Sequence, residues 1–397
     1  RRIFHRVRWG LGLIIVGVVA ATAWSYFAHN LPLNTEGALT IFRFFENFAL
    51  LILTGFFLQT SPGFLKMAAL AQLSTLVYLY GFVGGNAWMM SNQMDRFRFL
   101  ENWPSTVSYH LLVSLGLIVT WLIFRSGTRG GFWITYLAGS ALAGILIWTQ
   151  SRAAWLGIII MSALAILLYR RLFSAPLLKL VWKGALVAGL FLVGFLLLPR
   201  PAQNIAILRV FPEPSPDINI YRGSPGGLLK LIAREQFSPI ITEPSRLHLW
   251  REYLKKAAVQ PWGLGISYFP ELAVSYDGIP RGPHNILLEA WTLGGILAVL
   301  GWLVIFAQAA RNTLKLLHAA KNGFWPFYLF LSLIGVGVAF FFDNMINFRL
   351  FWIIAGLGIY LSSENMPEVS LGFPVWLKNI LASRRGELNR QEAARSS

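Results

Sequence analysis

The residues of this chain whose types could support chemistry are a few arginines and one histidine at the ends of apolar segments. His284 directly precedes one such segment, Arg246 begins an amphipathic stretch, and Arg152 fills a short junction between two apolar runs. An imidazole with a pKa of about 6.5 can take a proton from a hydroxyl, and the Arg fork binds phosphate oxygens. Arginines and a histidine that converge at a boundary between water and lipid would therefore suit a lipid-linked pyrophosphate.

Four neighbouring side chains are candidates for supporting roles. Trp250 lies one helical turn into the amphipathic stretch, and Arg281 and Asn285 stand close to His284. Glu289 lies about a turn and a half beyond His284, where a structural hydrogen bond and a catalytic role are equally open. A single interfacial Arg or His commonly has a structural role, so the prediction rests on the whole set.

Metal and cofactor chemistry have few candidates in the sequence. The chain has no cysteine, which excludes disulfides, thiolate zinc sites and cysteine nucleophiles. It has no H-E-x-x-H or D-x-D motif and no paired acidic cluster near the candidate residues, so we expect neither a metal ion nor a cofactor. Gly263-Leu264-Gly265 lacks the full spacing and the lysine of a nucleotide-binding loop, and we interpret it as a turn after a helix.

The composition indicates that lipid surrounds most of the chain. Of its 397 residues, 56% are hydrophobic and 13% are charged, and the mean hydropathy is +0.57. A soluble domain with this composition would expose much of its apolar surface. The net charge of +17 would suggest nucleic acid in a soluble protein, but beside a membrane it is better explained by topology and anionic lipid. We expect membrane lipids and no nucleic acid among the partners.

Hydropathy predicts about ten transmembrane helices, so the expected fold is all-α, a polytopic transmembrane helical bundle. A helix needs roughly 20 apolar residues to cross the hydrocarbon core. The predicted spans are Trp9–Phe27, Leu39–Leu58, Met67–Gly85, Thr106–Phe124, Phe132–Trp148, Ala153–Tyr169, Leu177–Leu198, Asn285–Ala309, Phe324–Phe342 and Phe348–Ser362.

The basic residues predict the orientation of the bundle. With the N-terminus inside, eighteen Lys and Arg fall in cytoplasmic segments, and only Arg96, Arg98 and Arg152 fall in the short segments on the other side. An excess of Lys and Arg is typical of cytoplasmic loops. We therefore predict that both termini are cytoplasmic and that Pro199–Pro283 is exterior.

The long exterior segment should fold, because it is too long for a tight connection. Its part Ser245–Gln260 has the period of an amphipathic helix, which Pro261 and Gly263 should end. The apolar face of this helix is predicted to hold Leu247, Trp250, Leu254 and Ala257.

The chain is thus expected to divide into four regions. These are an N-terminal transmembrane bundle of about seven helices (1–198), a loop domain (199–284), three C-terminal transmembrane helices (285–363) and a cytoplasmic tail (364–397). In the tail we expect a short membrane-surface helix over Val375–Ala382.

Charged residues within or near the spans have structural explanations. Arg43 and Glu46 are three residues apart and are expected to neutralise each other. Lys183 is expected to extend to the cytoplasmic surface. Asp343 and Asn344 lie at the outer rim, where capping is the favoured role.

Three short motifs in this order resemble the O-antigen ligase and polymerase superfamily. The resemblance covers roughly residues 150–301, and its pieces are short but specific in combination. They are Ser151-Arg152-Ala153-x-Trp155, Arg246-x-x-x-Trp250 followed by Pro261-Trp262-Gly263-Leu264-Gly265 and Phe269, and Pro283-His284-Asn285-x-x-Leu288 with Gly294. Members usually have about twelve spans, so any missing pair is expected before Arg1, and a shorter protein is also consistent.

The resemblance implies an inverting, metal-independent glycosyltransferase that transfers a glycan from undecaprenyl pyrophosphate. Ligases of this kind attach the glycan to a sugar of lipid A–core, and polymerases extend another lipid-linked glycan. By the matching motifs, His284 would be the base, and Arg152 and Arg246 would hold the donor pyrophosphate. The protein would be a multi-pass protein of the bacterial inner membrane with its active site facing the periplasm.

Other functions stay open at this point. The peptidoglycan polymerases of the cell-division and rod-shape type have a similar number of spans and a long loop at the same place, but they rely on an acidic residue in it. A transporter of lipid-linked glycans would carry paired charges near the bilayer midplane and two similar halves, and the sequence shows neither. A non-enzymatic scaffold would explain the loop but not the arginines and the histidine.

The predicted orientation can be tested with fusions to a reporter that fluoresces only in the cytoplasm. A reporter inserted near Gly226 should be dark, and one fused after Ser397 should be bright, because the basic segments hold both termini inside. Bright fusions near Gly226 would overturn the orientation and, with it, the placement of the candidate residues on one face.

Overall fold

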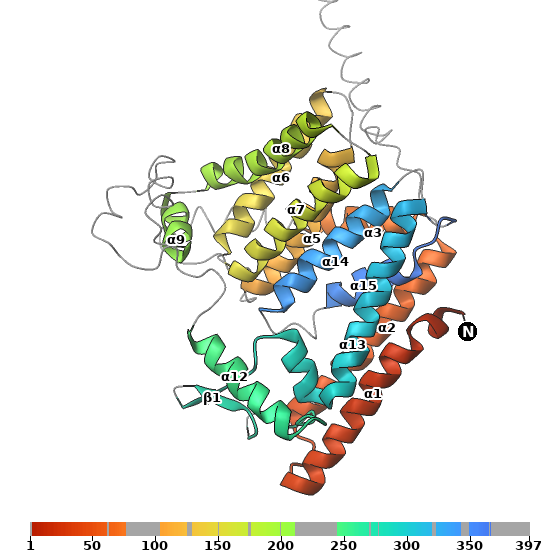
Figure 1. The fold of residues 1–397 in the computed structure, drawn as a ribbon, viewed down its shortest axis with the longest axis vertical. Helices are drawn as coiled ribbons and strands as arrows, with labels where there is room; N and C mark the ends of the chain where they lie inside the picture. The colour runs from red at the N-terminus through yellow and green to blue at the C-terminus, as the bar shows by residue number, and fades with distance from the viewer. Residues whose placement is uncertain are drawn as a thin grey trace, which may run out of the picture.

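The computed structural model shows a helical bundle with a small β-hairpin and one amphipathic helix at one end (Figure 1). It describes residues 2–61, 63–76, 104–124, 129–149, 151–173, 176–198, 200–210, 244–269, 271–276, 278–319, 323–342, 349–364 and 366. The predictions made for Arg96 and Arg98, for Asp343 and Asn344 and for the tail helix lie outside these residues.

Twelve helices and one two-stranded sheet form in the described residues. The N-terminal half contributes α1 (Arg2–His29), α2 (Thr35–Thr60), α3 (Phe64–Leu76), α5 (Pro104–Phe124), α6 (Arg129–Trp148), α7 (Arg152–Phe173), α8 (Leu177–Leu197) and α9 (Arg200–Val210). The C-terminal half adds α12 (Pro244–Val259), β1 (Val274–Tyr276), β2 (Ile279–Arg281), α13 (Ile286–Ala319), α14 (Phe324–Phe340) and α15 (Arg349–Tyr360).

The helices fit the predicted all-α membrane protein. Within the described ranges, α1, α2, α5, α7, α8 and α13 are six helices long and apolar enough to cross a bilayer. Shorter apolar helices lie in α6, α14 and α15. Each predicted span coincides, at least in part, with one of these helices or with α3. The number of helices that cross the bilayer, and their orientation, stay predictions.

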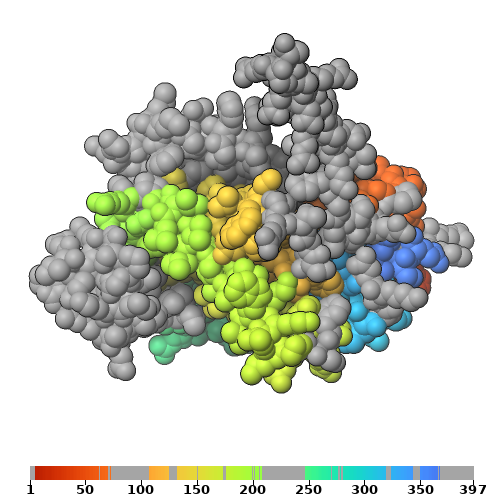
Figure 2. All heavy atoms as spheres, turned by 90° about the horizontal axis from the view of Figure 1, so that it is seen from above, coloured from red at the N-terminus to blue at the C-terminus, as the bar shows by residue number. Residues whose placement is uncertain are grey.

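Helix α14 is the centre of the bundle. Nearly every residue of α14 is buried, and it packs against α5, α7 and α13. A helix that is apolar on all sides is expected to lie inside a bundle. On one flank α13 lies along α1, and α15 lies along α2 (Figure 1). Seen from above, the blue C-terminal residues gather beside the red N-terminal ones, and the yellow and green residues of α6 to α8 lie apart from them (Figure 2).

Helix α13 is broken at Gly294–Gly295, and the turn that follows α12 fills the break. The amide of Leu264 donates to the carbonyl of Thr292 at 2.8 Å. The amide of Ile296 donates to the carbonyl of Pro261 at 2.9 Å. A backbone polar group away from water needs a partner within the protein, so this turn replaces hydrogen bonds that the broken helix has lost.

The same turn also docks against the end of α1. The hydroxyl of Ser25 donates to the carbonyl of Leu264, and the rings of Trp24 and Trp262 lie 5.9 Å apart between centroids. The predicted turn at Gly263-Leu264-Gly265 is confirmed, and its left-handed glycines allow it to pass between α1 and α13. Three segments that are far apart in sequence therefore meet at this point.

Two charged residues within the helices bind groups of other helices, and the pairing of Glu46 differs from the predicted one. Glu46 forms an ion pair with Arg349 of α15 (2.7 Å from Nε to Oε1) instead of with Arg43. Lys183, which is half-buried, donates to the carbonyl of Leu122 near the end of α5. The last carbonyls of a helix have no partner inside the helix, and an Arg fork matches a carboxylate, so both contacts have a clear physical basis.

Replacing Gly295 by alanine should destabilise the bundle. This residue has φ of 64°, and a Cβ there would collide with the backbone of Trp262. Holding a non-glycine residue in such a conformation costs on the order of 1–3 kcal/mol, so thermal unfolding in detergent should show a lower Tm. Gly12→Ala is the matched control, because nothing lies within 4 Å of its Cβ position in α1. Equal melting temperatures for the two variants would contradict this account of the break.

Candidate functional site

The short connection between β2 and α13 carries the candidate base. β1 and β2 pair antiparallel, with Val274 opposite Arg281. His284 follows with φ of 47°, a left-handed conformation that is uncommon for residues other than glycine. The residue is half-buried. Such a conformation persists only where the surrounding structure holds it, so the neighbours of His284 define the site.

Asn285 caps α13 and ties it to α14. Its Oδ1 accepts hydrogen bonds from the amides of Leu287 (2.9 Å) and Leu288 (3.1 Å), as expected for an N-cap residue. Its Nδ2 donates to the carbonyl of Phe341 at 2.9 Å. The residue that follows His284 is thus fixed on both sides.

Arg246 reaches the next carbonyl at the end of α14. Its Nη1 donates to the carbonyl of Phe342 at 2.7 Å, and the residue is half-buried. This bond uses one of the five N–H donors of a guanidinium. Arg246 and Asn285 therefore bring α12, α13 and α14 together at one end of the bundle.

Arg152 begins α7 at the same end. The hydroxyl of Ser151 accepts from the amide of Ala154 (3.4 Å), which helps the helix to start directly after the junction. Helix α7 packs along α14, with Gly157 facing the backbone of Gly335. The two helices run in opposite directions, so the first turn of α7 lies at the end of α14 that Arg246 and Asn285 reach.

The predicted site residues therefore gather at one end of the bundle, although in different ways. Trp250 donates from its indole to the carbonyl of Pro283 at 2.8 Å. The side chain of Arg281 is exposed, and this residue joins the network through its carbonyl. Glu289 is half-buried in the first turn of α13, where a carboxylate is favoured by the helix dipole.

Sequence reasoning missed Tyr253. This residue is 0% exposed, and its hydroxyl donates to the carbonyl of Arg281 at 2.7 Å and accepts from the amide of Val274 at 3.2 Å. Tyr253 lies seven residues after Arg246 and three after Trp250, which places all three on one face of α12. That spacing is a signal that could have found it.

The predicted apolar face of α12 is wrong in part. The bounds of the helix agree with the prediction, but Leu247 and Leu254 are 49% and 58% exposed. The buried face instead holds Leu249 and Tyr253. Apolar periodicity favours leucine over tyrosine for a buried position. A phenol that has hydrogen-bond partners can, however, be buried as fully as a leucine side chain.

Two buried phenols, Tyr253 and Tyr268, lie close to the carboxylate of Glu289. Burial raises the pKa of Tyr253 to about 12, and the negative charge of Glu289 adds to the shift. Burial likewise raises the pKa of Tyr268, and Tyr253 and Glu289 raise it further. Both phenols therefore stay protonated at neutral pH and remain hydrogen-bond donors.

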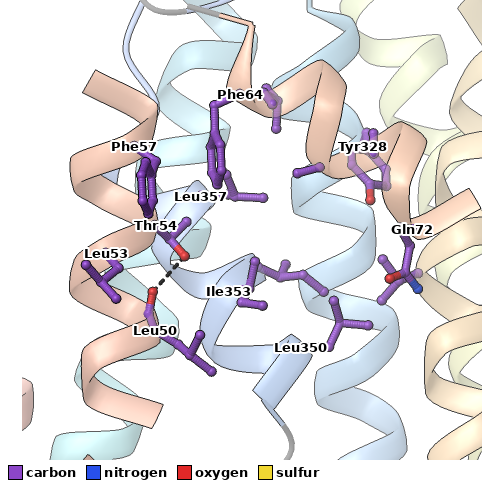
Figure 3. A pocket seen from close by; sticks show the side chains of 15 residues that line it. Leu50, Leu53, Thr54, Phe57, Phe64, Gln72, Tyr328, Leu350, Ile353 and Leu357 are labelled. Atoms are coloured by element: carbon purple, nitrogen blue, oxygen red, sulfur yellow. Dashed lines mark hydrogen bonds between the residues drawn. The ribbon is translucent and has the colours of Figure 1, made fainter. Parts of the chain in front are cut away.

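A largely apolar cavity of about 380 Å³ opens between α2, α3, α5, α14 and α15 (Figure 3). Its few polar lining side chains are Thr54, Gln72 and Tyr328. The hydroxyl of Thr54 donates to the carbonyl of Leu50 within α2 (2.7 Å). The cavity has the size of a small-ligand site, and its lining suits a hydrocarbon chain.

Part of the chain matches a known family. Residues 137–303 match the family model described as O-antigen ligase. This match covers less than half of the chain and supports the resemblance to the O-antigen ligase and polymerase superfamily. The matched part of this ligase-like chain contains Arg152, Arg246 and His284 together with the break in α13. No curated protein matches the chain.

Within the described residues, no group of three or more His, Cys, Asp or Glu is placed to hold a metal ion. The described residues at the α12 end of the bundle offer guanidinium groups, an imidazole, a carboxylate and phenols. These groups can bind an anion and move a proton.

Proposed function

We propose that this protein transfers a glycan from undecaprenyl pyrophosphate to a sugar hydroxyl of lipid A–core at the periplasmic face of the inner membrane. The observation that carries the proposal is the network that joins Arg246 and Asn285 to the end of α14. Asn285 directly follows His284, and all three residues lie in the part of the chain that matches the family. In the proposal, His284 would serve as the general base and Arg246 as an anion-binding group at the end of α14.

In the proposed reaction, His284 takes the proton of the acceptor hydroxyl while the oxygen attacks the anomeric carbon of the donor. The bond from that carbon to the pyrophosphate oxygen breaks on the opposite face, and the pyrophosphate leaves with the electron pair. The configuration at the anomeric carbon is therefore inverted. Arg246 and Arg152 are proposed to stabilise the negative charge that develops on the leaving group, which costs little reorganisation because both are already in place.

The apolar cavity supports a lipid-linked donor. We propose that part of the isoprenoid chain occupies it, because its walls are almost entirely hydrocarbon and it reaches Leu350 in the first turn of α15. Phe342, whose carbonyl binds Arg246, lies eight residues before Leu350 in the sequence. A pyrophosphate at Arg246 would thus have a place for its chain between the helices.

The acceptor separates a ligase from a polymerase, and the same site could serve either. Purified protein should be incubated with a polyprenyl-pyrophosphate glycan and, separately, with lipid A–core or with a second lipid-linked glycan. We expect transfer to lipid A–core. Extension of the second glycan alone would instead identify a polymerase.

Replacing His284 should affect turnover more than donor binding. If His284 is the base, His284→Ala should lower kcat by roughly a hundred- to ten-thousand-fold with little change in donor affinity. Arg246→Ala and Arg152→Ala should weaken donor binding as well as turnover, and lysine at either position should rescue only partly, since an ammonium cannot form a bidentate fork. The measurement is transfer per folded molecule in excess chelator, because the proposed reaction uses no metal ion.

A structural role for these three residues gives a different result. In that case each alanine variant loses thermal stability in detergent, and the molecules that stay folded keep their activity. A stable His284→Ala protein with near wild-type turnover would remove His284 from the mechanism and make Glu289 the next candidate base. Activity that EDTA abolishes and magnesium or manganese restores would contradict the metal-independent reaction.

Filling the cavity should discriminate between donors by the length of their chain. Ala68 lines the cavity, so Ala68→Trp should displace part of an isoprenoid chain. Loss of about two buried methylene groups corresponds to roughly a tenfold rise in KM for a long-chain donor. A donor with a short chain should show little change. Ala185→Trp, at an exposed position of α8, is the matched control. An equal rise in KM for both donors would show that the isoprenoid chain does not occupy this cavity.

A further inference from the structure

We propose that Tyr253 is a positioning residue for His284, and that it acts through the backbone between β2 and α13. The inference rests on the proposed role of His284 as a base. Tyr253 has no predicted role from the sequence motifs, and its hydroxyl binds backbone groups of the hairpin.

The connection that carries His284 is held at three successive points. Tyr253 donates to the carbonyl of Arg281, three residues before the histidine, and Trp250 donates to the carbonyl of Pro283, directly before it. Asn285, directly after it, is tied to α14. The left-handed backbone of His284 thus lies between fixed neighbours, which is the condition under which a strained conformation persists.

The hydroxyl of Tyr253 bridges the two strands of the hairpin. It accepts from the amide of Val274 in β1 and donates to the carbonyl of Arg281 in β2, and these two residues are register partners. A two-stranded hairpin is at best marginally stable on its own. The phenol of Tyr253 therefore attaches Val274 and Arg281 to α12. The chain continues from Arg281 to His284.

The chemistry of a buried tyrosine suits this role. Tyr253 is fully buried, and its raised pKa of about 12 keeps the phenol protonated over any physiological pH range. Phenylalanine would keep the ring and remove only the hydroxyl. The buried carbonyl and amide that it binds would then lose this partner, which makes the bound arrangement of the hairpin less favourable.

The test is Tyr253→Phe, compared with Tyr360→Phe as the control. Tyr360 is 1% exposed, similar to Tyr253, but it lies at the end of α15 against Gly55 of α2 and outside the proposed machinery. Tyr253→Phe should lower kcat roughly ten- to a hundredfold while KM for the donor stays within about twofold, because a displaced base slows proton transfer but leaves the arginines in place. Tyr360→Phe should keep wild-type kcat.

A double-mutant cycle separates positioning from general loss of structure. If Tyr253 acts through His284, Tyr253→Phe should cause no further loss of turnover in a His284→Ala background. An equal loss in both backgrounds would overturn the proposal, as would wild-type kcat in Tyr253→Phe itself.

A measurement that does not depend on enzymatic activity distinguishes this inference from the proposed function. The chain has no cysteine, so Ser275→Cys, at an exposed position of β1, accepts a single nitroxide label. Tyr253→Phe should increase the mobility of this label, and Tyr360→Phe should not. Unchanged mobility would overturn the proposal even if turnover falls. Full turnover in His284→Ala would overturn the proposed base, and the label would still decide whether Tyr253 holds the hairpin.

Discussion

A backbone amide or carbonyl surrounded by hydrocarbon must find its partner inside the protein, and the break in α13 is where this constraint shapes the molecule most. Gly294–Gly295 interrupt the helix. Pro261 and Leu264, in the turn after α12, form hydrogen bonds with the backbone groups that the break leaves without partners in the helix. Because this turn directly follows α12, the break also determines where α12 lies. The position of α12 near His284 thus depends on the hydrogen bonds between the break in α13 and the turn after α12.

The same requirement recurs at the ends of other helices. The last carbonyls of a helix lack partners within it, and in this bundle Arg and Asn side chains from other segments donate to carbonyls at helix ends. Arg246 and Asn285 do so at the end of α14, and Arg6 and Asn312 do so at the end of α15. Polar residues in an apolar bundle therefore mark the points where helices end and segments meet.

This arrangement explains why structural and chemical roles are hard to separate at the candidate site. Arg246 binds the end of α14, and the proposed function assigns the same guanidinium to the donor pyrophosphate. A site assembled from helix ends is also more precisely held than one on a free loop. His284 stands between anchored neighbours, so the strain of its left-handed backbone is supported from α12 and α14.

The sequence by itself determined what depends on local pattern. Runs of apolar residues are enough to place helices, and Pro261 with Gly263 and Gly265 is enough to end α12 in a turn, because period and backbone preference act between near neighbours. The motifs also singled out Arg152, Arg246 and His284, which the fold brings to one end of the bundle.

Only the tertiary structure decided which distant groups satisfy one another. Glu46 pairs with Arg349, which is 303 residues away, although Arg43 lies one turn away on the same helix. Tyr253, and not Leu254, faces inward from α12, because the hairpin offers its hydroxyl both a donor and an acceptor. Apolar periodicity measures only the cost of exposing a side chain to water, whereas the partner that makes a polar side chain stable inside the protein comes from another part of the fold.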